Sequence, residues 1–428
     1  MKAPPRTVFR LAIAALLLAF AAFPQRAQAG WEALLSSRSY GPEFMLAIDK
    51  DSQKFFMLTR RSPLAVTAQY PCTTGQALGD KLREGDLRTP EGVYFIQGKI
   101  EGGLDYDLYG DLAFPLNFPN PVDRIKGKTG QGIWVHGRGK PLQPRETRGC
   151  VALSAADIKS IEHKLTPGMP VVIAERLSVD QKTRQDSHTA LLLSKKLEQW
   201  ARDWENGDDR FFEHYAPEKF TKAQGTPFEA FRESKKRIFA SQPWLQVYVD
   251  NVGMVAGPDY WVTYFDQLYR SASLTSTGRK RLYWQQDDSG EWRIVGREFL
   301  PSSTSLLPGY LAAKTQEIKG MIEAWRRSWK QADLDAYLSF YEHDARQDDR
   351  RGREAIAKHK QRIWAANPPA DIFFEPPTVV LHEQGLEVRF LQTYAGENGY
   401  ADKGVKTLVL EPRGEGWAIV SELWEPLS

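Results

Sequence analysis

The second half of the sequence repeats itself at a spacing of 125 residues, and this repeat limits the possible folds more than any other feature. Rare aromatic residues recur in one register, so that Trp200 and Trp204 correspond to Trp325 and Trp329. The same shift relates polar and apolar positions further along: Asp208 and Asp333, Arg237 and Arg362, Pro243 and Pro368, Phe265 and Phe390, Gln267 and Gln392, Tyr269 and Tyr394, and Trp292 and Trp417. Two copies of one structural unit are therefore predicted.

Each copy begins with a helical pattern and ends in strands. Leu193, Leu197, Trp200 and Trp204 follow one another in steps of three to four, which places them on one face of a helix. Alternation of apolar and polar residues marks strands later in each copy, and turn signals such as Asp288-Ser289-Gly290 separate them. A helix followed by antiparallel strands predicts an α+β unit in which a curved sheet closes over a long helix.

This order of elements, with its W-x-x-x-W-x-x-x-D opening, resembles the nuclear-transport-factor-2-like (NTF2-like) fold, a cone with a pocket. The resemblance covers residues 190–302 and 314–428. Such domains serve as enzymes, binding pockets or dimerisation modules, so the fold does not define the function. The paired tryptophans are expected to be core aromatics, and sugar-binding pockets are the alternative. Because neither copy shows a catalytic His/Asp or paired-carboxylate pattern, catalysis is expected elsewhere.

The N-terminal 29 residues have the pattern of a secretory signal peptide. Lys2, Arg6 and Arg10 precede an apolar run over residues 11–23, and Ala27-Gln28-Ala29 provides a cleavage site before Gly30. An uncleaved membrane anchor is the alternative, although the apolar run is short for a membrane span. The mature chain of residues 30–428 is therefore expected in the periplasm or cell envelope, with membrane contact only before cleavage.

The charge balance and the motif content exclude several classes of function. The predicted leader takes four of the 57 basic residues, which leaves 53 against 54 acidic residues and no electrostatic reason to expect nucleic acid as a partner. No zinc-ligand spacing and no phosphate-binding loop occurs, so no metal and no cofactor is predicted.

Residues 30–175 are predicted to form a β-rich domain that carries the reactive groups. His136 ends a predicted strand, and thirteen residues separate it from Cys150. An imidazole can accept the proton of a thiol that attacks a carbonyl, so the pair could act as nucleophile and base. The alternatives for Cys150 are a small buried residue or a disulfide with Cys72, which an oxidising compartment would favour. Cys72 itself is expected to be an inert strand residue.

The residues around this pair resemble the L,D-transpeptidase (YkuD-type) family. That family's signature is His-Gly, a spacer, and Ser/Thr-His/Arg-Gly-Cys before an apolar residue, which here reads His136-Gly137 and Thr147-Arg148-Gly149-Cys150-Val151. Thr74-Gly75, Thr89-Pro90-Glu91-Gly92 and the segment of residues 114–120 also look like that family. The spacer is a little short, and Arg148 stands where many members have a second histidine.

The resemblance implies a role for each residue of the signature. Cys150 would form a thioester, and His136 would act as its base and later as the acid. The carbonyl of Gly137 would orient the His136 ring. The backbone N–H groups of Gly149 and Cys150 would form an oxyanion hole. Substrate binding is the role implied for two neighbouring side chains, with a guanidinium well suited to a substrate carboxylate: Thr147 and Arg148.

The three predicted domains together resemble peptidoglycan-trimming enzymes that set cell shape in some helical bacteria and join this catalytic fold to one NTF2-like domain. The implied substrate is the bond between the diamino acid and the terminal D-alanine of a tetrapeptide stem. L,D-transpeptidation is the first prediction, and L,D-carboxypeptidation to a tripeptide is the second. A non-catalytic wall-binding scaffold remains the third, in which the NTF2-like domains hold a glycan or a protein partner.

Overall fold

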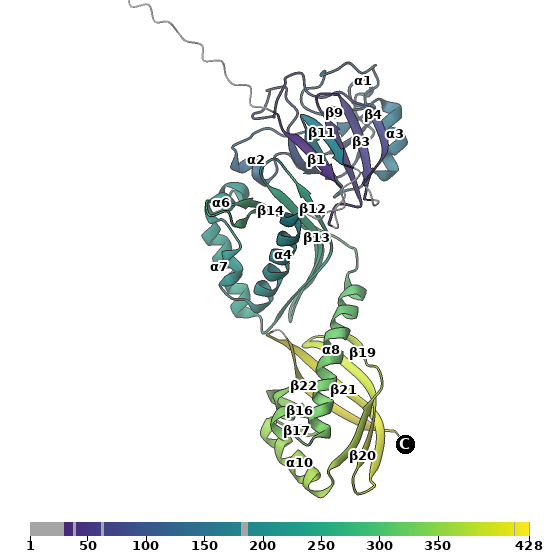
Figure 1. Ribbon diagram of the computed structural model, residues 1–428, viewed down its shortest axis with the longest axis vertical. Helices are drawn as coiled ribbons and strands as arrows, with labels where there is room; N and C mark the ends of the chain where they lie inside the picture. Colours follow the sequence, from purple (N-terminus) through teal and green to yellow (C-terminus); the bar gives the residue numbers. More distant parts are fainter. Residues whose placement is uncertain (1–29, 37–39, 61–63, 181–186, 415, 428) are drawn as a thin grey trace, which may run out of the picture.

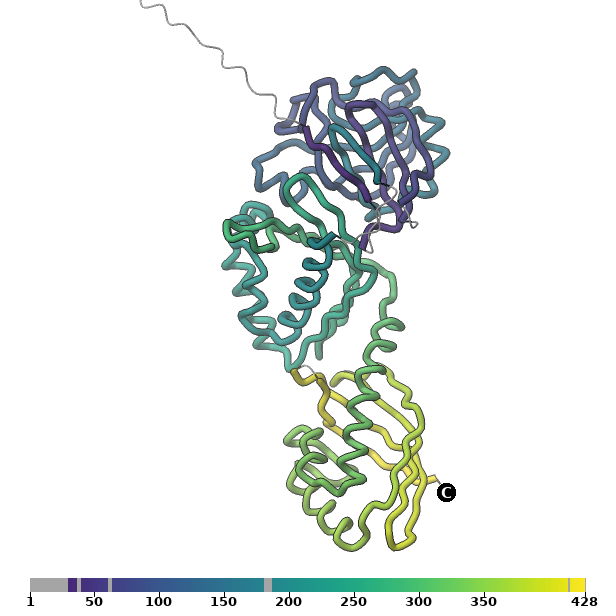
Figure 2. The backbone as a smooth tube through the Cα atoms, viewed as in Figure 1, coloured from purple at the N-terminus to yellow at the C-terminus, as the bar shows by residue number. Residues whose placement is uncertain are grey.

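The computed structural model describes residues 30–36, 40–60, 64–180, 187–414 and 416–427, and the predicted signal peptide lies outside them. Three bodies follow one another along the long axis of Figure 1, from the purple N-terminal domain to the yellow C-terminal one. Figure 2 shows the chain passing once between the second and third bodies, in the short segment between residues 301 and 307. Among the described helices, none is long and apolar enough to cross a membrane.

The first domain is built from two main sheets around one apolar core. The five-stranded sheet has the order β4-β3-β2-β10-β5, and the four-stranded sheet has the order β6-β7-β8-β9. Their strands are β2 (Phe44–Asp49), β3 (Lys54–Thr59), β4 (Ala65–Pro71), β5 (Gly92–Phe95), β6 (Ile100–Glu101), β7 (Leu112–Pro115), β8 (Trp134–His136), β9 (Val151–Ala152) and β10 (Pro170–Ala174). The core between the sheets includes Leu46, Phe114, Val135 and Val151, which are all buried.

Smaller elements complete the first domain. Strands β1 (Glu32–Ser36) and β11 (Arg176–Asp180) pair in parallel as a separate two-stranded sheet. Three short α-helices and one turn of 3-10 helix connect the main strands: α1 (Tyr106–Tyr109), α2 (Pro121–Ile125), α3 (Ala155–Ile161) and η1 (Glu162–Lys164). Asn120 caps α2 because its side chain accepts hydrogen bonds from the Val122 and Asp123 amides.

The first repeat folds as one long helix under a four-stranded antiparallel sheet. Its helices are α4 (His188–Asn206), α5 (Arg210–Glu213), α6 (Pro217–Gln224) and α7 (Phe228–Ser241), and its strands are β12 (Leu245–Ala256), β13 (Trp261–Ser271), β14 (Thr275–Gln286) and β15 (Trp292–Pro301). Trp200 and Trp204 of α4 are buried against Phe265 and other aromatic side chains of this domain. They are core residues, as expected from their helical spacing.

The second repeat has the same plan with a larger sheet. It contains α8 (Leu307–Lys330), α9 (Leu334–Ser339), α10 (Arg353–Ala366), β16 (Tyr341–Gln347), β17 (Arg350–Arg351), β18 (Pro369–Phe374), β19 (Thr378–His382), β20 (Gly385–Gly396), β21 (Ala401–Arg413) and β22 (Gly416–Pro426). The sheet has the order β17-β16-β22-β21-β20-β18, with β19 also paired to β20. The predicted fold class, a β-rich domain followed by two α+β domains, is confirmed.

The two repeats differ in one strand of the sheet and in one segment that is a helix in the first repeat and a strand in the second. Strand β12 is continuous and bends at a bulge beside Asn251, whose φ is 52°. The equivalent stretch is split into β18 and β19 by Pro376-Pro377, because proline has no N–H to donate to a ladder. Helix α6 packs on α2 of the first domain, whereas the second repeat forms strand β16 at the corresponding positions.

The face of the first repeat's sheet that points away from α4 packs on the first domain and shares a core with it. The hydroxyl of Tyr260 accepts hydrogen bonds from the backbone N–H of Val93 at 2.8 Å and from Asn120 Nδ2 at 3.1 Å. The fully buried Arg281 lies 4.0 Å from the centre of the Phe95 ring. These contacts join the first two domains into one packed unit.

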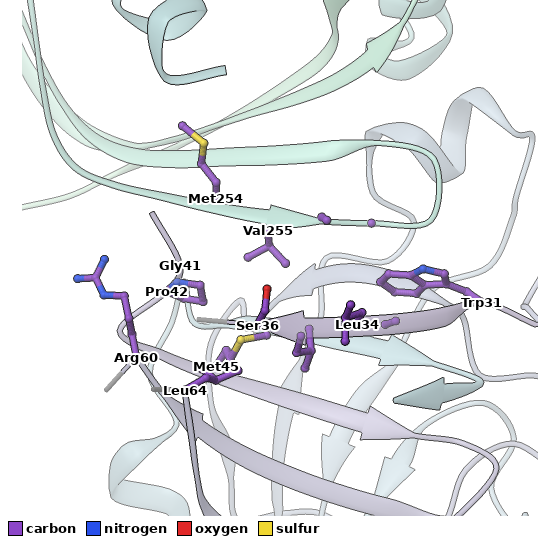
Figure 3. A pocket seen from close by; sticks show the side chains of 14 residues that line it. Trp31, Leu34, Ser36, Gly41, Pro42, Met45, Arg60, Leu64, Met254 and Val255 are labelled. Carbon is purple, nitrogen blue, oxygen red and sulfur yellow. The ribbon is translucent and has the colours of Figure 1, made fainter. Parts of the chain in front are cut away.

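A small apolar pocket of about 120 Å³ marks the edge of this interface. Figure 3 shows Val255 of β12 on one side and Leu34, Met45 and Leu64 of the first domain on the other, while the Met254 side chain points away from them into the core of the first repeat. Apolar side chains from both domains therefore meet in the interface, alongside the polar contacts made by Tyr260.

The second repeat contacts the first through a buried arginine at the end of β13, next to Leu268 and Tyr248, which pack in the core of the second repeat. Arg270 donates to the hydroxyl of Tyr310 on α8 at 3.0 Å and to the carbonyl of Gly385 at 3.2 Å. Since Arg270 and Tyr310 are both buried, these hydrogen bonds are shielded from water and define how α8 leaves the first repeat.

We expect Tyr260→Phe to destabilise the first domain by about 1–3 kcal/mol, because it leaves the buried Val93 N–H without its acceptor. Urea unfolding followed by circular dichroism measures this loss. Tyr264→Phe is the matched control, since Tyr264 lies in the same interface but its hydroxyl makes no hydrogen bond to a described residue. Equal effects of the two substitutions would contradict the assigned role of the Tyr260 hydroxyl.

Candidate active site

Parallel pairing of β8 with β9 brings His136 and Cys150 to neighbouring strands. The register places Val135 opposite Val151 and His136 opposite Ala152, so Cys150 comes directly before the paired part of β9. Two hydrogen bonds between Thr73 and Ala152, of 2.8 and 2.9 Å, hold the other side of β9. The two residues predicted as base and nucleophile are thus set on one sheet, with the Cys150 side chain half-buried.

The His136 ring is held in a single tautomer by its own neighbour. Its Nδ1 atom lies 2.5 Å from the carbonyl oxygen of Gly137, and a carbonyl can only accept a hydrogen bond. Nδ1 therefore carries the proton, and Nε2 is left as an acceptor. Burial lowers the pKa of His136 to about 4, although the Gly137 hydrogen bond opposes this. The ring is consequently neutral at pH 7 and able to take up a proton at Nε2.

The Cys150 thiol is also neutral at rest. Its Sγ atom lies 3.4 Å from the carbonyl oxygen of Gly132, to which the thiol donates. Burial raises the pKa of Cys150 to about 11, and the backbone N–H of Trp134 and the charge of Lys81 only partly oppose this. In the described part of the chain no hydrogen bond joins Sγ to His136. Catalytic hydrogen bonds are often long without substrate and tighten when it binds.

The turn before Cys150 requires glycine at position 149. Gly149 has φ of +128°, and a Cβ atom there would lie 2.8 Å from the carbonyl oxygen of Arg88. The buried Thr147 hydroxyl donates to the Cys150 carbonyl at 2.7 Å and accepts from the Gly149 N–H at 3.1 Å. Thr147 thus stabilises the turn, and the Gly149 N–H already has an acceptor. The Cys150 N–H donates to no backbone carbonyl of a described residue.

Arg148 points outward from the same turn. It is exposed, and its guanidinium group makes no hydrogen bond or ion pair with any described residue. The nearby Arg138 differs, because it is buried and paired with Glu146. The charge of Arg148 therefore remains available to a ligand.

Two supporting residues were not identified from the sequence. Thr89, fully buried, accepts from the Gly75 N–H at 2.8 Å and donates to the Cys150 carbonyl at 3.4 Å. Gln53 donates from Nε2 to the Thr74 hydroxyl at 2.7 Å, and its Oε1 atom accepts from the Thr74 N–H at 3.1 Å and from the Arg145 N–H at 3.0 Å. The segments that contain Thr74 and Thr89 carried a signal through the family resemblance, whereas Gln53 lies in an ordinary strand turn and carried none.

Cys72 is separate from this site. It is buried in the core of the first domain, and burial, followed by the charge of Asp49, raises its pKa to about 12. Both cysteines are free thiols in the structure, which does not contain the alternative disulfide between Cys72 and Cys150.

The first repeat contains a histidine–carboxylate pair that the sequence did not reveal. His214 Nε2 lies 2.8 Å from Asp203 Oδ2, and Asp203 is buried. The pair links α4 to the residue that follows α5, and the His214 carbonyl accepts from the Ile294 N–H at 2.7 Å. The sequence gave no signal for this pair, because Asp203 lies on α4 and His214 directly follows α5, and only the fold brings them together.

The fold defines a class of protein, a β-rich domain that carries a histidine and a cysteine on neighbouring strands, followed by two α+β modules. Residues 43–173 match the L,D-transpeptidase catalytic domain (YkuD) family, and residues 192–298 and 317–423 each match the Cds6 C-terminal NTF2-like domain family. The chain therefore contains an L,D-transpeptidase catalytic domain, and through its two C-terminal repeats it belongs to the Cds6 C-terminal NTF2-like domain family.

Individual relatives share parts of this arrangement. The putative L,D-transpeptidase YafK of Escherichia coli K12 is 32% identical over 90 residues, which are 21% of this chain and 33% of YafK. The match thus spans about a third of that relative's length. Bd1075 of Bdellovibrio bacteriovorus has a TM-score of 0.49 and 26% identity, covering 63% of this chain and 97% of its own. The helical cell shape determining protein Pgp2 of Campylobacter jejuni has a TM-score of 0.48 and 24% identity, covering 63% and 93%.

Alkylation of Cys150 by iodoacetamide in a Cys72→Ser variant should be slow at pH 7 and should still be accelerating at pH 10. The pKa of about 11 means that thiolate, the reactive form, accumulates only as the pH approaches that value. Peptide mass spectrometry over time gives the rate. A rate that levels off below pH 8 would show a preformed thiolate and contradict the neutral pair. In the reverse variant, Cys150→Ser, the deeply buried Cys72 should react more slowly still.

Proposed function

We propose that this chain is a peptidoglycan-modifying cysteine enzyme that acts on the bond between the diamino acid and D-alanine of tetrapeptide stems. The observation that carries the proposal is the His136 ring, fixed by Gly137 with Nε2 unprotonated, on the strand beside Cys150. The match of residues 43–173 to the L,D-transpeptidase catalytic domain supports the substrate class. Peptidoglycan lies outside the cytoplasm, which agrees with the signal peptide expected over residues 1–29.

The first step forms a thioester between Cys150 and the stem. The Sγ–H proton moves to His136 Nε2 as Sγ bonds to the carbonyl carbon of the diamino acid. When the tetrahedral intermediate collapses, the C–N bond to D-alanine breaks, and His136 returns the proton to the leaving amine. Because thiol and imidazole are both neutral at rest, proton transfer accompanies the attack and no stable ion pair precedes it.

Charge on the intermediate and on the substrate needs partners near Cys150. The Cys150 N–H has no backbone acceptor and is the first candidate for the oxyanion hole. The Gly149 N–H becomes a second donor of the oxyanion hole only if its hydrogen bond to the Thr147 hydroxyl breaks. Arg148, exposed and unpaired in the described structure, binds the carboxylate of the stem.

The acceptor of the acyl group decides the overall reaction. An amine from a second stem gives a 3-3 crosslink and L,D-transpeptidase activity, which we propose first because of the catalytic domain's family. Water gives L,D-carboxypeptidase activity and a tripeptide. Both reactions share the Cys150 thioester, so the identity of the products separates them.

Purified muropeptides with tetrapeptide stems provide the test. The wild-type chain should release D-alanine and give either tripeptides or 3-3 dimers, whereas Cys150→Ala should lose at least about a thousandfold in rate because it lacks the nucleophile. Liquid chromatography with mass spectrometry identifies the products. Cys72→Ser, which removes the other thiol, should retain full activity. Identical products from wild type and Cys150→Ala would instead support a non-catalytic wall-binding scaffold.

A further inference from the structure

The inner faces of the two NTF2-like domains are built from equivalent residues. The inner face is the side of each sheet that packs on the long helix, α4 in the first domain and α8 in the second. The 125-residue shift relates a tryptophan on the long helix, a lysine on helix α7 or α10 and a glutamine on strand β13 or β20: Trp204 and Trp329, Lys235 and Lys360, and Gln267 and Gln392. The strand register extends this equivalence to a second lysine. Phe265 pairs with Lys280 in the first domain, and Phe390 pairs with Lys406 in the second.

At one inner position the two domains carry opposite charges. Strand pairing places Arg297 opposite Leu282 in the first domain and Glu422 opposite Leu408 in the second. Arg297 and Glu422 are also related by the 125-residue shift. The two inner faces thus share two lysines and a glutamine but differ by the exchange of a carboxylate for a guanidinium.

The second domain neutralises its own lysines. Glu422 is buried, forms an ion pair with Lys406, and accepts a hydrogen bond from Gln347 Nε2 at 2.7 Å. Burial disfavours its charge, but Lys406 and Lys360 outweigh burial and lower the pKa of Glu422 to about 2. A carboxylate therefore fits between these lysines and satisfies them.

The first domain has the cations without the carboxylate. Lys235 Nζ and Lys280 Nζ lie 4.0 and 4.2 Å from the centre of the Trp204 ring. No carboxylate of a described residue lies within 4 Å of Lys235, Lys280 or Arg297. Burial, followed by repulsion from Arg297, lowers the pKa of Lys235 to about 7. Burial and both neighbouring cations also lower the pKa of Lys280.

Buried polar atoms on the same face also lack partners. Gln267 is 2% exposed, and its Oε1 atom has no hydrogen-bond donor. The Nε1 atom of Trp204 and the Nε atom of Arg297 are buried without acceptors. Such groups are costly unless something satisfies them. Lys235 and Arg297 are half-buried, so part of each side chain reaches solvent, whereas Lys280 is buried.

We propose that the first NTF2-like domain binds a carboxylate between Lys235, Lys280 and Arg297, in the place that the Glu422 side chain takes in the second domain. The ligand carboxylate pairs with the three cations, and the Lys235 and Lys280 ammonium groups lie against the Trp204 ring. A neighbouring N–H or O–H of the ligand donates to Gln267 Oε1. The site is separate from Cys150 and does not depend on the proposed reaction.

Calorimetric titration of the full chain with N-acetyl-D-alanine and with its uncharged amide tests the site. The titrations use an Arg148→Gln variant of the full chain, because Arg148 is the carboxylate-binding residue proposed near Cys150. We expect the acid to bind and the amide to bind at least about tenfold more weakly, because charge-assisted hydrogen bonds hold the carboxylate. Succinate distinguishes the source of the carboxylate: tighter binding of N-acetyl-D-alanine indicates a peptide terminus, and tighter binding of succinate indicates a free small acid.

Two substitutions locate the binding. Arg297→Glu reproduces the charges of the second domain and should weaken binding of the acid at least about tenfold. Lys235→Ala, on a half-buried helix position, should do the same and covers the case in which Arg297→Glu fails to fold. Lys360→Ala, at the equivalent position of the self-neutralised domain, should leave binding unchanged. The proposal would be overturned if neither acid bound, or if Arg297→Glu and Lys235→Ala both bound the acid as tightly as the Arg148→Gln variant does. Neither result would change the muropeptide products expected of the wild-type chain.

Discussion

The parallel pairing of β8 with β9 is the constraint on which the catalytic arrangement depends. Strand β9 contains only Val151 and Ala152, so its position is fixed by its neighbours. The backbone of Thr73 holds one side of it, and the Leu153 N–H donates to the His136 carbonyl at 3.0 Å on the other. These short-range bonds within a buried core set the thiol and the imidazole on adjacent strands before any substrate arrives.

Burial then determines the resting chemistry of the site. It raises the pKa of the thiol and lowers that of the imidazole, so both groups are neutral over the physiological range. A neutral thiol is a poor nucleophile and also a poor target for oxidants. In the proposed reaction, the carbonyl and the carboxylate of the substrate engage the Cys150 N–H and Arg148 and favour proton transfer.

Much of this organisation could be predicted from the sequence, because it rests on local patterns. Aromatic residues at helical spacing identified the repeat and the buried tryptophans, and the residues around Cys150 identified the catalytic domain. Gln53 and the His214–Asp203 pair could not be predicted, since their partners are brought together only by the fold. Helix α6 and strand β16 differ for a similar reason: α6 packs on the neighbouring domain, whereas β16 pairs with β22. The repeat shows that Arg297 corresponds to Glu422, but the strand register was needed to show that both residues lie beside the paired lysines.

The most direct test of the central claim is to observe the thioester itself. The wild-type chain is mixed with a tetrapeptide muropeptide, quenched in acid within milliseconds to seconds, and digested for peptide mass spectrometry. The account predicts a transient mass increase on the peptide that contains Cys150, equal to the muropeptide less D-alanine, and none on the Cys72 peptide. Release of D-alanine by the chain without any adduct on Cys150, under conditions that preserve thioesters, would contradict it.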